Sequence, residues 1–243
     1  MRKKLFLVIV ICVASAHLYA QQLKIDSVAI SILDRMSAVV GELSACSVTI
    51  KSDYDVKSKE FGLIKHSDDQ QLFLHGPNKL LVKSEGDKGS RLFTYNGKTL
   101  TFYSNDKNHY GQVEINGSIM NMIDSANKAY GFEFPVADFF YPTFVDDIIA
   151  EAKNLTFLGM TKVNDKECFH IAGTAKDKTF QFWISDDVYY LPMKMVIIYN
   201  DKDNSPQYEA TMTNWVINPV LPDALFEFVT PLKAKHIKLK VKK

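Results

Sequence analysis

The sequence predicts an α+β domain in which antiparallel strands form one sheet that curls as it grows, with helices grouped on one face. Three observations lead to this fold class. The apolar residues of 26–43 recur with helical spacing, whereas most later segments alternate apolar and polar residues with a period of two. Residues 117–150 interrupt the strands with a helical insert rich in aromatic side chains. Helix, strands, insert and strands therefore follow one another along the chain.

The first 20 residues have the three parts of a secretory signal peptide. Cations at 2–4 are followed by an apolar run at 5–14 and by the small residue Ala20 at a cleavage position, with Ala16 as an alternative. The apolar run is shorter than the roughly 20 residues that a membrane-spanning helix needs, which argues against a retained anchor. Cys12 lies inside this run and lacks the small residue that precedes a lipidated cysteine. We therefore expect a periplasmic protein with no transmembrane anchor after cleavage.

Residues 21–243 are expected to form a single domain. Their length suits one β-rich domain, because sandwiches and barrels often contain about 200–250 residues. Without the three cations of the signal segment, 26 of the 29 basic residues remain against 28 acidic ones, a net charge of −2. This balance argues against nucleic acid as a partner, which requires a basic surface. An aromatic content of 12% is sufficient for an extensive core.

Local signals place the elements before the insert. Residues 26–43 are expected to form one amphipathic helix, with Asp26 or Ser27 accepting hydrogen bonds from its first free N–H groups. The clearest hairpin covers 91–103. Its turn, Asn96-Gly97, allows the positive φ that a type I′ turn requires at both central positions.

The insert and the following strands have equally clear boundaries. A helix that includes Ile119 is expected to end at Gly131, with short helical turns around Pro142. One helical turn near 222–226 is expected to lead into the last strand. The strands after the insert are placed at 154–163, 166–175, 178–185, 191–200, 206–217 and 226–229.

The sequence contains no recognisable catalytic or metal-binding motif. G-x-S-x-G, H-E-x-x-H and C-x-x-C are all absent. The histidines are not spaced as metal ligands on one element. The doublet Asp68-Asp69 is expected in a loop and makes a poor acid–base pair, because adjacent side chains diverge. We therefore expect no catalytic residues, no metal and no cofactor.

Two cysteines, Cys46 and Cys168, remain after signal cleavage. In an oxidising compartment they have the opportunity to form a disulfide. Alternatively, each is a small buried apolar side chain. His170 shares a strand face with Cys168, but no third residue that would orient a Cys–His nucleophile is evident. Both alternatives for the cysteines remain open from the sequence.

Stretches distributed over nearly the whole mature chain carry a family resemblance. They are Ser44–Ile50, Gly86–Phe93, Tyr95–Leu100, Tyr130–Pro135, Leu191–Lys194 and Leu221–Phe228, together with Ala137 and Asp138. In these stretches the chain resembles an uncharacterised family of predicted periplasmic proteins. That family looks like part of the superfamily of the lipoprotein carrier LolA and the receptor LolB.

The resemblance implies a strongly curved antiparallel sheet that forms an incomplete barrel, covered on its concave side by helices. In that superfamily an apolar cavity between sheet and helices holds acyl chains or apolar peptide segments. The carrier holds its lid helices with an arginine on an early strand, but residues 47–57 contain no arginine here. Arg91, on a middle strand, is the alternative for that role.

The aromatic insert is the expected cover of the cavity. Burial of one aromatic ring contributes about 1.5–3 kcal/mol, so the insert is expected to pack on the concave sheet face. Strand 178–184 has two faces, and we expect the face with Phe180 and Phe182 to line the cavity. The expected ligand-binding residues are Phe132, Phe134, Phe139, Phe140, Phe144, Phe180, Phe182, Met195 and Ile197. A solid core made of the same residues is the alternative.

Three functions follow from this reading. The first is a periplasmic binding module for lipids, lipoproteins or other amphiphiles, with a lipid or an acylated protein as the ligand. The second is an envelope sensor or protein-interaction domain on the same fold, which would expose a large apolar patch to an envelope protein partner. The third is a hydrolytic enzyme, which would gather titratable groups with perturbed pKa values in a cleft.

Overall fold

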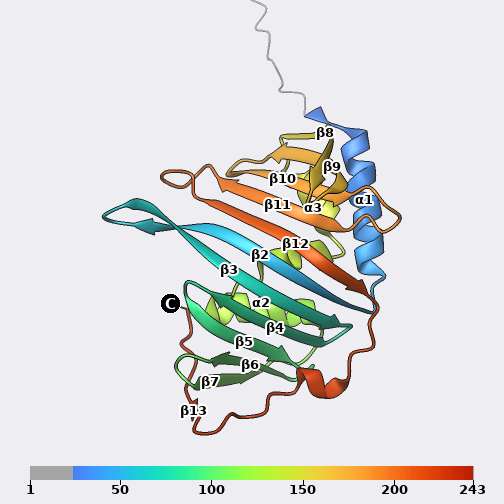
Figure 1. Cartoon of the computed structure of the whole chain (residues 1–243). Helices are drawn as coiled ribbons and strands as arrows, with labels where there is room; N and C mark the ends of the chain where they lie inside the picture. The colour runs from blue at the N-terminus through green and yellow to red at the C-terminus, as the bar shows by residue number, and fades with distance from the viewer. Residues whose placement is uncertain (1–23, 243) are drawn as a thin grey trace, which may run out of the picture.

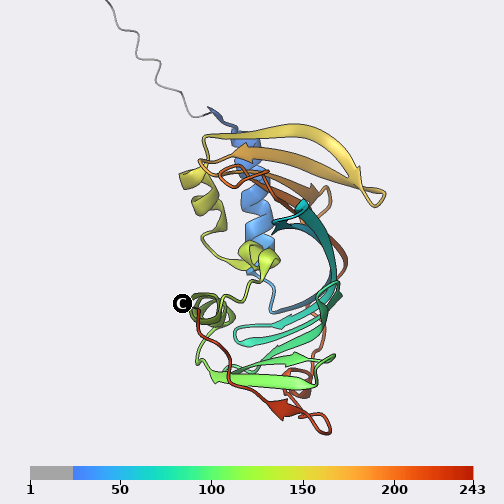
Figure 2. The same ribbon diagram turned by 90° about the vertical axis from the view of Figure 1, so that its left-hand side faces the viewer.

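A computed structural model of the chain describes residues 24–242, which form one large curved sheet and the helices that it surrounds (Figure 1). The signal peptide expected at 1–20 lies outside the described residues. The sheet has 13 strands in the spatial order β1-β8-β9-β10-β11-β12-β2-β3-β4-β5-β6-β7-β13. Figure 2 shows the sheet bending around the helices, which lie on its concave side. The expected curved, unclosed sheet with helices on its concave face is confirmed.

The strands form two successive antiparallel runs, one on each side of the insert. The first run comprises β2 (Ala45–Ser58), β3 (Gly62–His75), β4 (Lys79–Gly86), β5 (Gly89–Tyr95), β6 (Thr99–Ser104) and β7 (His109–Glu114). The second comprises β8 (Asn154–Val163), β9 (Lys166–Thr174), β10 (Lys178–Ser185), β11 (Pro192–Tyr199) and β12 (Gln207–Ile217). The runs are joined where β12 pairs antiparallel with β2.

Two short strands at the chain ends complete the sheet. Strand β1 (Lys24–Ile25) pairs parallel with β8, and β13 (Lys235–His236) pairs parallel with β7. The sheet is therefore mixed rather than wholly antiparallel. Each of these strands contributes only two residues, which covers part of an otherwise unpaired edge.

Helix α1 (Ser27–Gly41) begins as the sequence predicts. The Asp26 carboxylate accepts a hydrogen bond from Val28 N at 2.8 Å, so Asp26 is the N-cap. The apolar face of α1 contacts strands β8 and β10. Its most deeply buried members include Leu33 and Met36, which are fully inaccessible to solvent.

The insert consists of α2 (Ile119–Tyr130), the 3₁₀ helix η1 (Pro135–Phe140) and α3 (Phe144–Glu151). Ser118 caps the start of α2 through its hydroxyl, and Gly131 ends it in the left-handed conformation at φ 70°. Tyr141 and its neighbours then connect η1 to α3. This arrangement matches the expected helix and places the aromatic residues of 131–144 over the sheet.

Between η1, α3 and the second run of strands, aromatic side chains of the core pack against one another. The ring of Phe182 lies edge-on to both Phe139 and Phe144, with centroids 5.6 Å apart in each pair. On the facing strand Gly173 stands opposite Phe180, and a Cβ there would lie 2.3 Å from the Phe180 ring. The ring therefore occupies the space that a side chain on β9 would need.

Two local expectations are wrong. The hairpin at 91–103 exists, but only Gly97 has positive φ, because the Asn96 carboxamide instead accepts hydrogen bonds from Lys98 N and Thr99 N. Residues 226–229 do not form the last strand. The 3₁₀ helix η2 (Asp223–Phe226) is followed by irregular chain, and the final pairing occurs at β13.

The structure does not join Cys46 and Cys168. Both are free and buried, Cys46 on β2 and Cys168 on β9. The strand order places these strands four positions apart, or roughly 19 Å at the usual strand spacing. Cys46 belongs to the core on the concave face, whereas Cys168 belongs to a small cluster with Val163 and Met193. A disulfide requires Cα atoms within about 7 Å, so the pairing does not fit this fold.

Candidate ligand-binding cavity

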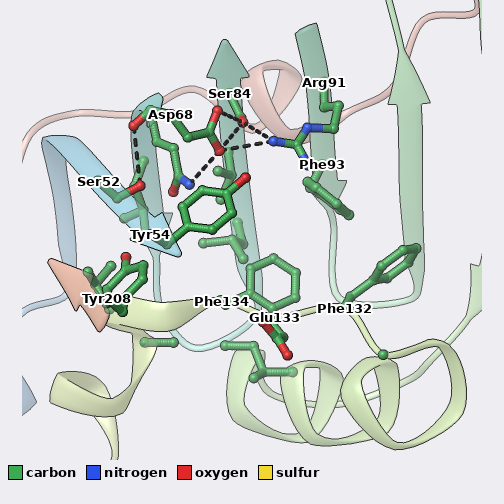
Figure 3. A pocket seen from close by; sticks show the side chains of 18 of the residues that line it. Ser52, Tyr54, Asp68, Ser84, Arg91, Phe93, Phe132, Glu133, Phe134 and Tyr208 are labelled. Carbon is green, nitrogen blue, oxygen red and sulfur yellow. Dashed lines mark hydrogen bonds and ion pairs between the residues drawn. The ribbon is translucent and has the colours of Figure 1, made fainter. Parts of the chain in front are cut away.

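A cavity of about 440 Å³ lies between the first run of strands and the insert (Figure 3). Strands β2 to β5 form one wall, α2 and residues 131–140 form the facing wall, and β12 with the β11–β12 loop closes one side. Its size falls within the range of about 300–1,000 Å³ typical of small-molecule sites. The concave sheet and its aromatic cover therefore leave space next to the first run of strands, whereas Phe139 and Phe144 pack directly against Phe182 of the second run.

Most of the cavity wall is apolar. Leu72 and Leu80 project from neighbouring strands, and Ile123 projects from α2. Phe93 on β5 contacts both Phe132 and Phe134 of the cover in edge-to-face geometry, with centroids 5.2 and 5.5 Å apart. These contacts connect the cover to the sheet in an arrangement that aromatic pairs prefer.

One end of the cavity is polar. Arg91 on β5 donates from Nη2 to Asp68 Oδ2 at 3.0 Å and to Ser84 Oγ at 3.1 Å. Ser84 Oγ lies 2.8 Å from both carboxylate oxygens of Asp68 and donates to the carboxylate. The Asp68 side chain is only 6% exposed, so Arg91 is the cation that compensates its buried charge.

Other polar groups extend this end of the cavity. Gln70 Nε2 donates to Asp68 Oδ2 at 3.1 Å, and Ser52 Oγ donates to the Asp68 carbonyl at 3.3 Å. Tyr208 of β12 also lines the cavity, and burial raises the pKa of its hydroxyl above the usual range. Figure 3 shows Asp68, Ser84 and Arg91 across the cavity from the aromatic cover.

Charged side chains surround the opening. Lys88 lies with its ammonium 4.7 Å from the centroid of the Tyr54 ring, and Lys202 lies 3.9 Å from that of Tyr199. All four residues line the cavity, as does Glu133 of the cover, which is exposed. Rings that stack against ammonium groups keep those groups near the opening without neutralising their charge.

The structure separates the expected site residues into two groups. Phe132, Phe134 and Phe140 line the cavity. Phe139, Phe144, Phe180, Phe182 and Met195 are buried in the core, and Ile197 is half-buried against it. In this second group Phe139 of η1 and Phe144 of α3 pack against Phe182 of β10, so these side chains belong to the core.

The polar end of the cavity was not predicted from the sequence. Asp68 and Asp69 lie within β3 and not in a loop, and alternation directs Asp68 into the cavity while Asp69 approaches Lys51. The register pairs Ser84 with Arg91 directly across β4 and β5. The sequence holds a signal in the polar residues that interrupt the apolar alternation on three successive strands, but that signal depends on knowing the register.

The polar groups do not form a recognisable catalytic arrangement. The Ser84 hydroxyl donates to a carboxylate that Arg91 already holds, so it lacks the free general base of an activated nucleophile. No histidine is among the residues that line the cavity. Within residues 24–242 no three His, Cys, Asp or Glu side chains come together as metal ligands. The arrangement is suited to binding, with an apolar wall for bulk and a polar end for orientation.

The fold and this cavity define a class of protein: a single curved sheet that encloses a ligand-sized cavity under a helical cover. The chain belongs to the family described as Predicted periplasmic protein (DUF2092), whose model matches residues 29–240. Within the described residues no helix has the length and hydropathy needed to cross a membrane. A search of curated proteins finds no match.

Solved structures share the fold at low sequence identity. The lipoprotein LppX of Mycobacterium tuberculosis is similar with a TM-score of 0.51 and 15% identity, over 81% of this chain and 98% of that chain. An uncharacterised conserved protein of Thermus thermophilus is similar with a TM-score of 0.50 and 10% identity, over 87% and 99% of the two chains. A LolA superfamily protein of Nitrosomonas europaea is also among the matches, with a TM-score of 0.37 and 9% identity, over 82% and 97%.

Proposed function

We propose that this protein is a periplasmic binding module that holds a lipid, an acylated protein or another amphiphile in the cavity between β2–β5 and the insert. The observation that carries the proposal is one covered cavity with an apolar wall and a polar end. An apolar chain placed there removes its own surface and that of the wall from water, at about 25 cal/mol per Å². The family description supports the compartment.

The two alternative functions have less support from the described residues. The most exposed large apolar side chains are Phe61 at the β2–β3 turn, Val188 and Val220 in two other loops, and Val229 and Leu232 in the segment between η2 and β13. Apolar residues exposed singly are normal on protein surfaces and do not define an interaction patch. A hydrolytic role would need an activated nucleophile, and Ser84 is bonded to a carboxylate already held by Arg91.

Fluorescent fatty acid binding tests the proposal. Phe134 lines the cavity and is half-buried, so Phe134→Asp puts a charge on the apolar wall and is expected to weaken binding at least about tenfold. The matched control is Phe61→Asp, because Phe61 is 69% exposed and does not line the cavity. Phe182→Asp is unsuitable, since Phe182 is buried in the core and its loss would unfold the protein.

Circular dichroism should show that both variants fold before binding is measured. Equal binding by folded Phe134→Asp and Phe61→Asp proteins would contradict the cavity as the site. Absence of binding by the unmodified protein would contradict an acyl ligand altogether. Native mass spectrometry of the protein purified from the periplasm then identifies any molecule that remains bound.

A further inference from the structure

The polar end of the cavity is more elaborate than an apolar ligand requires. Asp68 and Ser84 are buried, and Asp68 forms an ion pair with Arg91 on the concave face, where neighbouring strands place leucine and valine. A buried ion pair seldom stabilises a fold more than well-packed apolar residues of the same volume. Its presence beside an apolar cavity therefore points to a role in recognising the polar part of a ligand.

The guanidinium of Arg91 retains unused hydrogen-bonding capacity. Nη2 donates both hydrogen bonds, to Asp68 and to Ser84, whereas Nη1 donates none within residues 24–242 and Nε is buried. A guanidinium presents its donors in a planar fork that matches a carboxylate or a phosphate. Nε and Nη2 share one edge of this fork, and Asp68 engages that edge through Nη2, so Nη1 is the donor nitrogen left for a ligand.

Charges at the opening add to this preference. Lys88 and Lys202 line the cavity, and neither has a carboxylate within 4.0 Å among the described residues. Asp55, which also lines the cavity, is already paired with Lys65 at 2.8 Å. Glu133 on the cover is the remaining acidic group. Two unpaired cations therefore face one unpaired carboxylate around the opening.

We propose that the cavity selects amphiphiles with an oxyanion headgroup, which Arg91, Lys88 and Lys202 hold while the hydrocarbon chain lies against the apolar wall. The headgroup is a carboxylate or a phosphate, since both present oxygens at the spacing of the guanidinium fork. This inference rests on the proposed function and adds the chemical class of the ligand. It assigns Asp68 and Ser84 the role of positioning the Arg91 side chain.

A panel of ligands with one chain and different headgroups tests the proposal. Palmitate and hexadecyl phosphate carry oxyanions, 1-monopalmitoylglycerol is neutral, and hexadecyltrimethylammonium is cationic. Each competes with the neutral dye N-phenyl-1-naphthylamine, whose fluorescence reports occupancy of the apolar wall. We expect one or both oxyanions to bind at least about tenfold more tightly than the neutral ligand, and the two anions to distinguish carboxylate from phosphate recognition. This preference should weaken as salt is added.

The double variant Lys88→Gln/Lys202→Gln tests the residues without disturbing the buried ion pair. Both lysines are exposed, so the variant is expected to fold. It should lose about tenfold in affinity for the oxyanions and retain its affinity for 1-monopalmitoylglycerol. Lys107→Gln is the matched control, because Lys107 is exposed in the β6–β7 loop and does not line the cavity.

The outcomes separate the two proposals. Equal affinity for oxyanion and neutral ligands, or tighter binding of the cationic ligand, would overturn the headgroup assignment and leave the binding function intact. Equal loss of affinity for all ligands in the lysine variant would also overturn it. Failure of every ligand and of the dye to bind would overturn the proposed function itself.

Discussion

At the scale of single residues, Arg91 connects the stability of the fold to the chemistry of the cavity. From the sequence Arg91 was a candidate for holding the cover, whereas its hydrogen bonds are made to Asp68 and Ser84 on the sheet. Its side chain is 27% exposed and that of Asp68 is 6% exposed. Arg91 therefore stands between a buried carboxylate and the open part of the cavity.

Arg91→Met is expected to destabilise the protein strongly, because it leaves the Asp68 carboxylate buried without a cation. The loss should be about 2–4 kcal/mol, somewhat less than the removal of one partner from a fully buried pair. The double variant Asp68→Leu/Arg91→Met should recover much of this loss, since it also removes the buried charge. Urea denaturation of the three proteins measures both effects. A double variant no more stable than Arg91→Met would contradict this account of the pair.

At the scale of elements, a glycine on β9 and a phenylalanine on β10 pack against each other. Gly173 on β9 stands opposite Phe180 on β10, and the ring lies over the glycine. The pairing fixes the register, because a shift by one residue would direct the Phe180 ring to the other sheet face. The Phe180 ring also stacks on Phe182, which in turn packs against Phe139 of η1 and Phe144 of α3.

Gly173→Ala is expected to cost about 1–3 kcal/mol, because the added Cβ overlaps a ring that the core holds in place. Phe180→Leu alone also destabilises the protein by leaving a cavity. Combined, the two substitutions should cost less than the sum of their separate effects, since each relieves the defect of the other. Thermal denaturation of the four proteins provides this double-mutant cycle. Strict additivity would show that the two positions do not interact.

Much of the element pattern was predictable from local signals. Asp26, Ser118 and Gly131 act as helix caps in the structure, and the strand boundaries of 154–163 and 178–185 agree with the alternation. The turn at Asn96-Gly97 departs from its usual type because the Asn96 side chain bonds two backbone N–H groups of the next strand. Local preference alone does not include this competing interaction.

The ligand-binding residues were harder to predict. The aromatic density of the insert identified a cover, but not which part of the sheet it fills. Phe139 and Phe144 pack on Phe182, whereas Phe132 and Phe134 lie over the first run of strands and line the cavity. That difference depends on the curvature of the whole sheet, which has no signature in any short segment. Asp68 was expected in a loop because an acidic doublet interrupts the apolar alternation there, although β3 continues through it.

At the scale of the whole molecule, buried acidic groups determine how the fold responds to alkali. Burial raises the pKa of Cys46 from 9.0 to about 12 and that of Cys168 from 9.0 to about 11. Burial also raises the pKa of Tyr95 above its usual value. These groups keep their protons in the folded protein at a pH where the unfolded chain loses them. Because the unfolded state then binds fewer protons, stability must fall as the pH rises above about 9.

The free energy of unfolding is expected to fall by about 2 kcal/mol between pH 9 and pH 10 through the two thiols together. Urea midpoints measured at each pH test this expectation. The double variant Cys46→Ala/Cys168→Ala should be less stable at pH 7 but should lose less stability over the same interval. An unchanged pH dependence in this variant would show that the thiols do not cause the effect.

The antiparallel pairing of β12 with β2 has a consequence for the order in which the strands of the sheet form. The β2–β7 run is complete in the chain before the insert begins, whereas the partner of β2 on its other side is β12, the last long strand. A chain that emerges N-terminus first therefore presents the free edge of β2, fourteen residues long, until residues 207–217 follow. Pairing of this edge with β12 requires closure of the longest loop between paired strands, so it is expected to be slow. Until β12 pairs, strands of other molecules can compete for the free edge of β2.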